Sequence, residues 1–238
     1  LSILSPRLFY YYAPTANQDD LPNFDSGEMA FSYAQLWRES RLSGFDRISD
    51  ANQISLGLEN SWMAKGRTWL DVGIGQTIYF KDREVSPYVE DRQYLVIDPS
   101  DTAAERRIKQ QFNRNIKKAY YRDTSDIAMQ GNWYPAPFHS VRSTLIADPY
   151  SNRFSQASLG YHYADEDQRI FNLSYRYKDQ PHAIDSAGEI HKQATDQIDG
   201  SFYLPVAAQW HIYQRTHVDI TRSELIENIS GVKYEGCC

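Results

Sequence analysis

One stretch near the end of the chain carries residues that could act together in acid–base chemistry. From Trp210 onward, alternate positions are polar: His211, Tyr213, Arg215, His217 and Asp219. Alternate residues of a strand share a face, so His217 and Asp219 would lie about 7 Å apart, within range for a carboxylate that orients a histidine base. A strand that lines a water-filled lumen shows the same pattern. We favour the interpretation that these residues line the lumen of a β-barrel. The alternative is a β-barrel hydrolase that uses His217 and Asp219 for catalysis.

The rest of the sequence offers little further catalytic chemistry. It has no glycine-rich phosphate loop, no CxxC pair and no HExxH motif. We therefore expect no bound metal, no cofactor and no enzymatic activity. The net charge of -6 is spread along the chain. Nucleic acid is therefore not an expected partner.

Cys237 and Cys238 are the only cysteines. Neighbouring side chains on a strand point to opposite sides, so the two thiols are poorly placed to bond one another. If they are oxidised, both partners should lie elsewhere.

The elements that would hold these residues are predicted to be β-strands. Between Phe154 and Lys178, apolar and polar residues alternate in two segments, and each apolar series ends in tyrosines. This pattern predicts a hairpin with one apolar and one polar face. An apolar band edged by aromatic residues is what a lipid-facing barrel strand requires.

The same analysis predicts an all-β chain: about ten meander strands of an antiparallel transmembrane β-barrel segment, with short helices in long extracellular loops. The strands run over Ile3 to Ala13, Asn52 to Ala64, Arg67 to Phe80, Ser125 to Tyr134, Ser140 to Pro149, Phe154 to Ala164, Arg169 to Lys178, Gln193 to Val206, Trp210 to Thr221 and Leu225 to Cys237.

The mean hydropathy of -0.63 is low for a membrane protein. It argues only against membrane-spanning helices, which need a run of about 18 apolar residues, because barrel strands offer lipid every second residue. The 18 tyrosines and five tryptophans suit the aromatic belts at the two membrane surfaces.

The connections fall into two classes. Long ones follow the first, third and seventh strands, and tight turns follow the second, fourth, sixth and eighth. In a meander these classes lie at opposite rims, and outer-membrane barrels keep short turns in the periplasm and long loops outside. The last strand would then end at the periplasmic rim, where disulfides form.

Two of the long loops contain predicted helices. Ser32 to Gln35 is typical of a capping box that opens a short helix toward Arg41, with Phe31 and Leu36 as its hydrophobic staple. A second box, Thr102 to Glu105, precedes a helix rich in cations: Arg106, Arg107, Lys109, Arg114, Lys117 and Lys118. This helix is either a solvated element whose apolar stripe packs on the rim or a cationic surface for the phosphates of an extracellular glycolipid.

Several motifs resemble those of the LptD family of outer-membrane LPS-assembly proteins. The most specific are the stretch from Asp46 to Gln53 and the vicinal Cys237 and Cys238. Further similar stretches are Pro6 to Pro14, Leu21 to Asp25, Phe31 to Leu36, Leu173 to Tyr177 and Gly231 to Tyr234. The resemblance is to the C-terminal barrel portion of the family and covers most of the chain; the loop from Lys81 to Thr124 is not distinctive.

The resemblance implies that residues 1–238 are part of a barrel of about 26 strands in the outer membrane of a Gram-negative bacterium. The N-terminal periplasmic jelly roll, the early strands and the closing strands would lie outside this chain. The barrel would receive lipopolysaccharide from a periplasmic bridge through the missing N-terminal domain, hold an LptE-type lipoprotein plug in its lumen, and release lipopolysaccharide among the membrane lipids of the outer leaflet.

For particular residues, the resemblance implies that Cys237 and Cys238 form disulfides with two cysteines of the absent periplasmic domain. The residues expected to line the lumen and help house the plug are Asn172, Ser174, Arg176, His211, Arg215 and His217. A soluble sandwich or lectin remains an alternative, since alternation alone does not say which face is wet.

Overall fold

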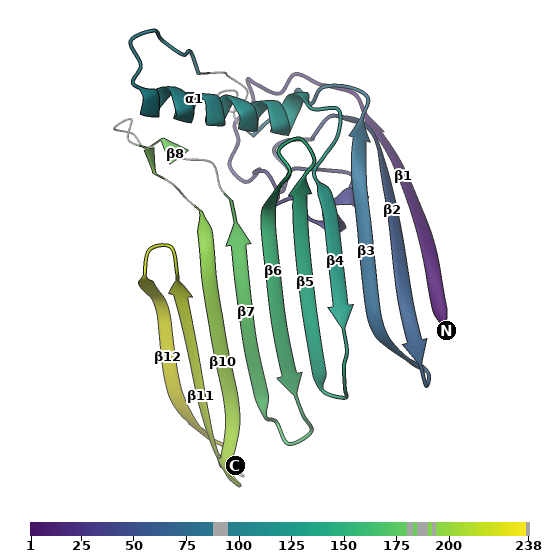
Figure 1. The fold of residues 1–238 in the computed structure, drawn as a ribbon, viewed down its shortest axis with the longest axis vertical. Coiled ribbons are helices and arrows are strands. Elements are labelled where there is room, and N and C mark those ends of the chain that lie inside the picture. Colours follow the sequence, from purple (N-terminus) through teal and green to yellow (C-terminus); the bar gives the residue numbers. More distant parts are fainter. Residues whose placement is uncertain (88–94, 180–182, 185–189, 192–193, 237–238) are drawn as a thin grey trace.

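The chain folds into one long antiparallel meander (Figure 1). The computed structural model describes residues 1–87, 95–179, 183–184, 190–191 and 194–236. Each strand of the main sheet pairs with the next along the chain. These strands are β1 (Ser2–Ala13), β2 (Ala51–Ala64), β3 (Arg67–Tyr79), β4 (Ile127–Trp133), β5 (His139–Asp148), β6 (Arg153–Ala164), β7 (Ile170–Lys178), β10 (Thr195–Ala207), β11 (Trp210–Asp219) and β12 (Glu224–Tyr234).

The expectation of ten antiparallel strands is confirmed, and the sheet is open, with β1 and β12 as its two edges. The predicted strand from Ser125 to Tyr134 is shorter than expected. The Ser125 hydroxyl accepts a hydrogen bond from the Thr77 N–H and donates one to the Asp126 carbonyl, so a side chain replaces part of the regular strand pairing there. Gln193, in the predicted eighth strand, lies outside the described residues.

The tight turn between β2 and β3 shows why the meander forms. Lys65 and Gly66 both have positive φ, 52° and 72°. Two successive positive φ values give a turn whose twist matches that of the flanking strands. The strand ends are therefore joined by two residues.

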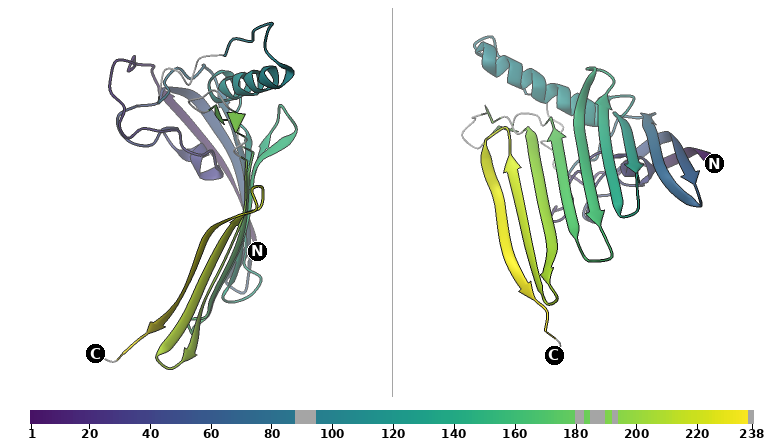
Figure 2. Two further views of the ribbon diagram at one scale, coloured as in Figure 1. Left: turned by 90° about the vertical axis from the view of Figure 1, so that its left-hand side faces the viewer. Right: turned by 60° about the horizontal axis from the view of Figure 1, so that its bottom comes forward.

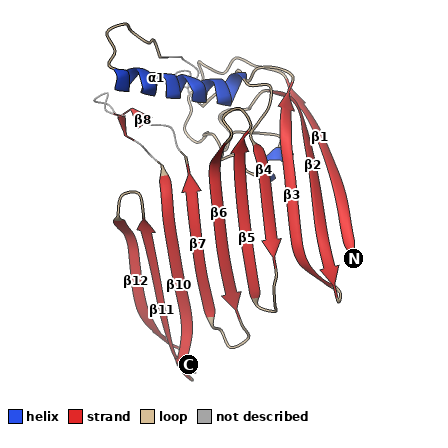
Figure 3. Cartoon of the chain, viewed as in Figure 1, coloured by secondary structure: helices blue, strands red, loops and turns tan. Residues whose placement is uncertain are grey.

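The long connections all lie at one end of the sheet, at the top of Figure 1. The third contains a small hairpin that the sequence did not predict, β8 (Ala183–Ile184) with β9 (Ile190–His191). The cartoon in Figure 3 shows how little helix there is: a 3-10 turn, η1 (Tyr33–Trp37), an α-helix, α1 (Ala103–Ile116), and a π-helical turn, η3 (Lys117–Tyr121). Among the described residues, no helix has both the length and the apolar character needed to cross a membrane.

Both predicted helix starts are present. Ser32 caps η1 by accepting a hydrogen bond from the Gln35 N–H, but the turn ends at Trp37 and does not continue toward Arg41. Thr102 and Glu105 form the complete reciprocal box at the start of α1. Phe31 and Leu36, the expected staple, belong to the same hydrophobic cluster.

The two faces of the sheet differ in chemistry, as the alternation predicts. The register pairs Leu159 with Tyr175 and Tyr161 with Leu173 on one face. Side chains on this face remain exposed: Leu159 is 53% and Leu173 55% exposed. Exposed aromatic residues lie toward both ends of the same face: Tyr10, Tyr12, Tyr175, Trp133, Tyr161, Phe171, Trp210 and Tyr234.

Candidate functional site: the inner face of the sheet

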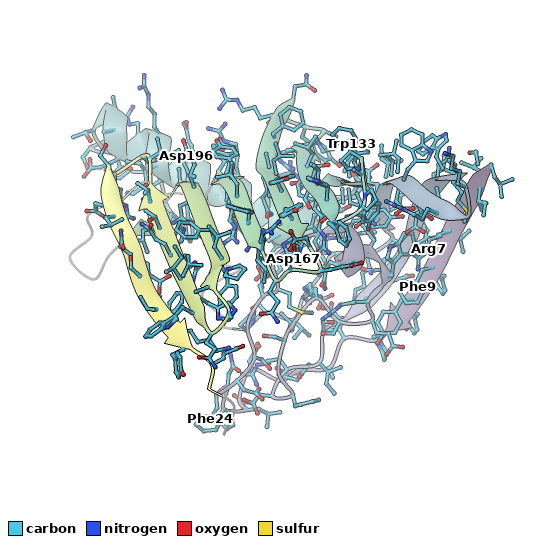
Figure 4. All side chains as sticks on the ribbon, turned by 90° about the horizontal axis from the view of Figure 1, so that it is seen from below. Arg7, Phe9, Phe24, Trp133, Asp167 and Asp196 are labelled. Carbon is cyan, nitrogen blue, oxygen red and sulfur yellow. The ribbon has the colours of Figure 1, made fainter. Side chains whose placement is uncertain are left out.

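The second face of the sheet is its concave side, here called the inner face (Figures 2 and 4). The strand registers bring the predicted lumen residues together on it. Asn172 pairs with Ser201, which pairs with Arg215, and Ser174 pairs with Asp199, which pairs with His217. Arg176 and His211 follow by alternation. The six residues therefore share one face, as predicted.

Polar side chains on this face bond to one another across neighbouring strands. The Asn172 amide donates to the Ser201 hydroxyl at 3.1 Å, and its carbonyl oxygen lies 2.6 Å from Nδ1 of His162. Arg215 forms ion pairs with Asp199 at 2.6 Å and Glu227 at 2.8 Å. Bonding across strands keeps long side chains extended along the wall.

The two residues of the alternative hydrolase hypothesis have other partners. Nε2 of His217 lies 3.2 Å from the side-chain oxygen of Gln197. Asp219 is buried and accepts a hydrogen bond from the Arg222 N–H in the turn after β11. The structure therefore gives no support to an acid–base pair at these positions.

His211 lies on the inner face but is not open to it. It is 5% exposed, and its ring stacks on Tyr203 at a centroid distance of 5.1 Å. Its contribution to a lumen surface is smaller than the sequence indicated.

The main feature that the sequence did not predict is the position of the first long connection. Residues 14–50, here called the inner segment, fold back over the inner face of β2, β3 and β4. Figure 4 shows the segment within the curve of the sheet, with Phe24 at its far side. The sequence placed this loop at the long-loop rim but did not show that it folds back against the wall.

The inner segment packs against three glycines of the sheet, here called the glycine patch: Gly57, Gly73 and Gly75. An added Cβ would lie 2.6 Å from the Trp37 ring at Gly57, 2.7 Å from Leu36 Cδ1 at Gly75, and 3.0 Å from the Tyr33 ring at Gly73. Only glycine admits such a close approach of side chain to strand backbone. The patch therefore fits the residues of η1 against the wall.

A small apolar core forms where the inner segment meets the sheet. Tyr33 and Leu36 are buried with Ala128 and Ile146, which project from the otherwise polar inner faces of β4 and β5. Phe31 and Trp37 pack against this cluster, and Tyr33 and Trp37 meet edge to face at 5.7 Å. Burial of these side chains stabilises the inward position of the segment.

Charged side chains fix the other end of the inner segment to the rim. Arg41 forms an ion pair with Asp50 at 3.1 Å and also donates to the Val85 carbonyl. Asp50 accepts the N–H groups of Glu84 and Val85 at 2.7 and 3.0 Å. Burial alone would raise the pKa of Asp50, but these two N–H groups and Arg41 outweigh it and lower the pKa below its usual value.

A second network ties the end of the β3–β4 connection to the strands below it. Arg83 is buried and donates to the Ala119 carbonyl at 2.6 Å, with its guanidinium 3.7 Å from the centre of the Tyr79 ring. Lys118 pairs with Asp126, and Arg122 pairs with Asp148 at 2.8 Å. The two long connections also meet, since the Tyr120 hydroxyl donates to Glu28 at 2.8 Å.

Between the inner segment, the rim and the wall lies a cavity of about 570 Å³. Its lining mixes both signs of charge and includes Arg38, Arg41, Asp50, Arg83 and Asp126. Among the described residues, no group of three or more His, Cys, Asp or Glu side chains has an arrangement that could hold a metal ion.

The structure divides the six predicted cations of the second helix. Lys109 pairs with Asp101 at 2.8 Å, and Lys118 pairs with Asp126. Arg106, Arg107, Arg114 and Lys117 are exposed. Cys237 and Cys238 lie outside the described residues, but β12 does end at the short-turn rim, as expected (Figure 1).

The sequence does contain residues that indicate, once the structure is known, where the inner segment packs. Gly57, Gly73 and Gly75 occupy polar-face positions of two adjacent strands, and the preceding loop offers Phe31, Tyr33 and Trp37. The three glycines become one surface only when the strands pair, and this pairing brings Gly57 opposite Gly75.

Comparison with known proteins agrees with this architecture. The family model for LptD, LPS transport system D, matches residues 1–210. The LPS-assembly protein LptD of Pseudomonas putida strain F1 is 32% identical over 257 residues, which cover 99% of this chain and 25% of that protein. Its counterpart in Methylococcus capsulatus strain Bath is also 32% identical, over 99% of this chain and 23% of the relative.

A third relative, the LPS-assembly protein LptD of Pseudomonas aeruginosa strain UCBPP-PA14, is 32% identical over 99% of this chain and 25% of its own length. The chain thus spans about a quarter of the curated relatives it matches. The family match, the agreement along the whole chain and the open meander of two-faced strands together show that this chain belongs to the LptD family.

Proposed function

We propose that this chain supplies ten consecutive wall strands of the outer-membrane barrel that inserts lipopolysaccharide into the outer leaflet. The observation that carries the proposal is the division of the sheet into an exposed apolar outer face, with aromatic residues toward both ends, and a polar inner face covered in part by the inner segment. A wall between hydrocarbon and a wet lumen needs this division. The printed names of the relatives supply the cargo, lipopolysaccharide.

Within this proposal the inner segment narrows the lumen next to β2, β3 and β4. A polar sugar chain can pass a wall of hydrogen-bonding side chains such as Asn172, Arg176 and Arg215, while the apolar contacts of Tyr33 and Leu36 keep the segment in place. The remaining inner face is open in this chain and is available to an LptE-type lipoprotein plug.

The periplasmic connection of the barrel falls at the end of β12. The chain leaves the sheet there at the short-turn rim, and Cys237 and Cys238 follow within four residues of Tyr234. Disulfides from these thiols to the absent periplasmic domain would couple the barrel to the domain that receives lipopolysaccharide from the periplasmic bridge.

The experiment uses the full-length protein in cells depleted of their own copy. Leu159→Lys and Leu173→Lys would each introduce a cation on the outer face, at a cost of about 2 to 4 kcal/mol if the position is near the middle of the bilayer. Ser158→Lys and Thr144→Lys, which lie opposite each other on the inner face, are the controls.

We expect the outer-face variants to reduce the amount of heat-modifiable barrel in the outer membrane and of lipopolysaccharide at the cell surface, and the inner-face variants to support both. Equal tolerance of the two pairs, or greater damage from the inner-face pair, would reject the proposed orientation. Normal surface lipopolysaccharide after depletion of the protein would reject the proposed function itself.

A further inference from the structure

Helix α1 presents a surface that the wall function alone does not require. At 100° per residue, Arg106, Arg107, Arg114 and Lys117 fall within an arc of about 100° around the helix axis. All four are exposed. The acidic residue of the helix, Glu105, lies outside this arc and is occupied by Thr102 in the capping box.

The sides of the helix that flank and oppose this arc are held by the chain itself. The Asn113 amide exchanges two hydrogen bonds with the backbone of Leu95, at 2.8 and 2.9 Å, and Lys109 pairs with Asp101. Ile116 is buried, and Ile108 and Phe112 are half-buried. The helix is therefore fixed by its apolar side, and the cationic arc is the side left open.

Local bonds do not neutralise the cationic arc. Arg106 donates to the Pro99 carbonyl and Arg114 to the Gln110 carbonyl, so both keep their charge unpaired with any carboxylate of the described residues. Arg107 and Lys117 form no ion pair within the described part of the chain. Four cations without a carboxylate partner among the described residues give this helix face a positive charge, which attracts anionic surfaces.

The position of α1 indicates which anionic surface this is. The helix lies beyond the long-loop ends of the strands. The left view in Figure 2 and the view in Figure 4 show it on the outer side of the sheet, opposite to the inner segment. If the outer face contacts hydrocarbon, the headgroups of the outer leaflet lie at the level just beyond those strand ends.

We propose that the arc formed by Arg106, Arg107, Arg114 and Lys117 binds the phosphate groups of lipopolysaccharide molecules that reside in the outer leaflet beside the barrel. This inference rests on the proposed function for the orientation of the wall. Guanidinium groups suit the occupant because they form paired hydrogen bonds to phosphate oxygens. The site would hold the finished lipid next to the protein that delivers it.

The test uses the purified full-length protein in phosphatidylcholine vesicles that contain rough lipopolysaccharide, or the same lipopolysaccharide after dephosphorylation. A photocrosslinking residue replaces Gln110, which is exposed and lies within the cationic arc. We expect crosslinks to the phosphorylated lipid and about tenfold fewer to the dephosphorylated one, because each cation near an anionic surface contributes to binding. This comparison needs no charge variant.

The paired variant Arg107→Gln with Lys117→Gln should give the same loss of crosslinking at unchanged heat-modifiability. The matched control, Lys65→Gln with Arg67→Gln, removes two exposed cations from the opposite rim and should leave crosslinking unchanged. Crosslinking that is absent with either lipid, insensitive to phosphate, or equally reduced by the control would overturn the site. Since the vesicle assay does not require transport, it reports on α1 even if depletion of the protein leaves lipopolysaccharide export intact.

Discussion

The indole ring of Trp37 lies directly over the backbone of Gly57, with Cζ2 and Cη2 both 2.6 Å from the point where a Cβ would stand. The contact joins the inner segment to the middle of β2. It makes a loop residue part of the wall and holds the segment against the inner face.

Replacing this glycine should therefore release the inner segment without unfolding the sheet. We expect Gly57→Val to cost about 1 to 3 kcal/mol through overpacking against Trp37, and to make a cysteine introduced at the buried Ala128 accessible to a thiol reagent. Gly160→Val is the control, since an added Cβ there meets nothing closer than 3.9 Å. Protection of Ala128→Cys in the Gly57→Val protein would show that the segment is held by other contacts.

The Arg41–Asp50 pair predicts that acid loosens the same segment. The folded-state pKa of Asp50 is lowered from its usual 3.8, so its contribution to stability is complete above that value and is lost as pH falls through the lower folded-state pKa. Labelling of Ala128→Cys, measured relative to a cysteine at an exposed position because acid lowers the thiolate fraction of both, should increase below about pH 4. Asp50→Asn should raise labelling at pH 7 and flatten the pH dependence of labelling. If Asp50→Asn keeps the same increase of labelling in acid, a titratable group other than Asp50 causes that increase.

A second close contact lies near the last strand. The Tyr213 phenol occupies the space where a Cβ of Gly231 would be, and the two residues are directly opposed on β11 and β12. Gly231→Ala should lower the temperature at which the full-length barrel loses heat-modifiability, and Tyr213→Ala combined with it should recover most of the loss. A double variant no more stable than Gly231→Ala would disprove the steric explanation.

Cys237→Ser with Cys238→Ser in the full-length protein should remove the covalent connection between the barrel and the periplasmic domain. On a non-reducing gel the variant should migrate differently from the oxidised parent protein, and after reduction the two should migrate alike. The same mobility in the variant and the oxidised parent would contradict the disulfide assignment.

His217→Ala provides the check on the hydrolase alternative. Since His217 bonds to Gln197 and Asp219 to the Arg222 N–H, neither variant His217→Ala nor Asp219→Asn should change lipase or protease activity in purified full-length protein by more than about twofold. A reproducible activity that either substitution abolishes would reopen the enzymatic hypothesis.

The strands and the chemistry of their faces follow from the sequence because a strand side chain has only two directions. The alternation of Leu159 and Tyr161 with Ser158 and Gly160 fixes which residues share a face before any pairing is known. The same logic placed Asn172, Arg176, Arg215 and His217 on one face, as the strand registers show. The turn at Lys65 and Gly66 is also local, since both residues adopt a left-handed backbone within two positions.

Partners far apart in the chain could not be assigned in this way. The sequence alone did not distinguish the paired Lys109 and Lys118 from the exposed Arg107 and Lys117, because their partners Asp101 and Asp126 lie eight positions away, beyond the i,i+3 and i,i+4 spacings that a helix pattern reveals. It likewise did not show that Tyr203 would cover His211.

By itself the sequence determined an antiparallel meander with one apolar and one polar face, because both properties depend on residues one or two positions apart. Only the tertiary structure decided that residues 14–50 lie inside the curve of the sheet. That outcome depends on Gly57 and Gly75 becoming neighbours through strand pairing and on the fit of Leu36 and Trp37 over them, and neither condition is expressed in any local pattern.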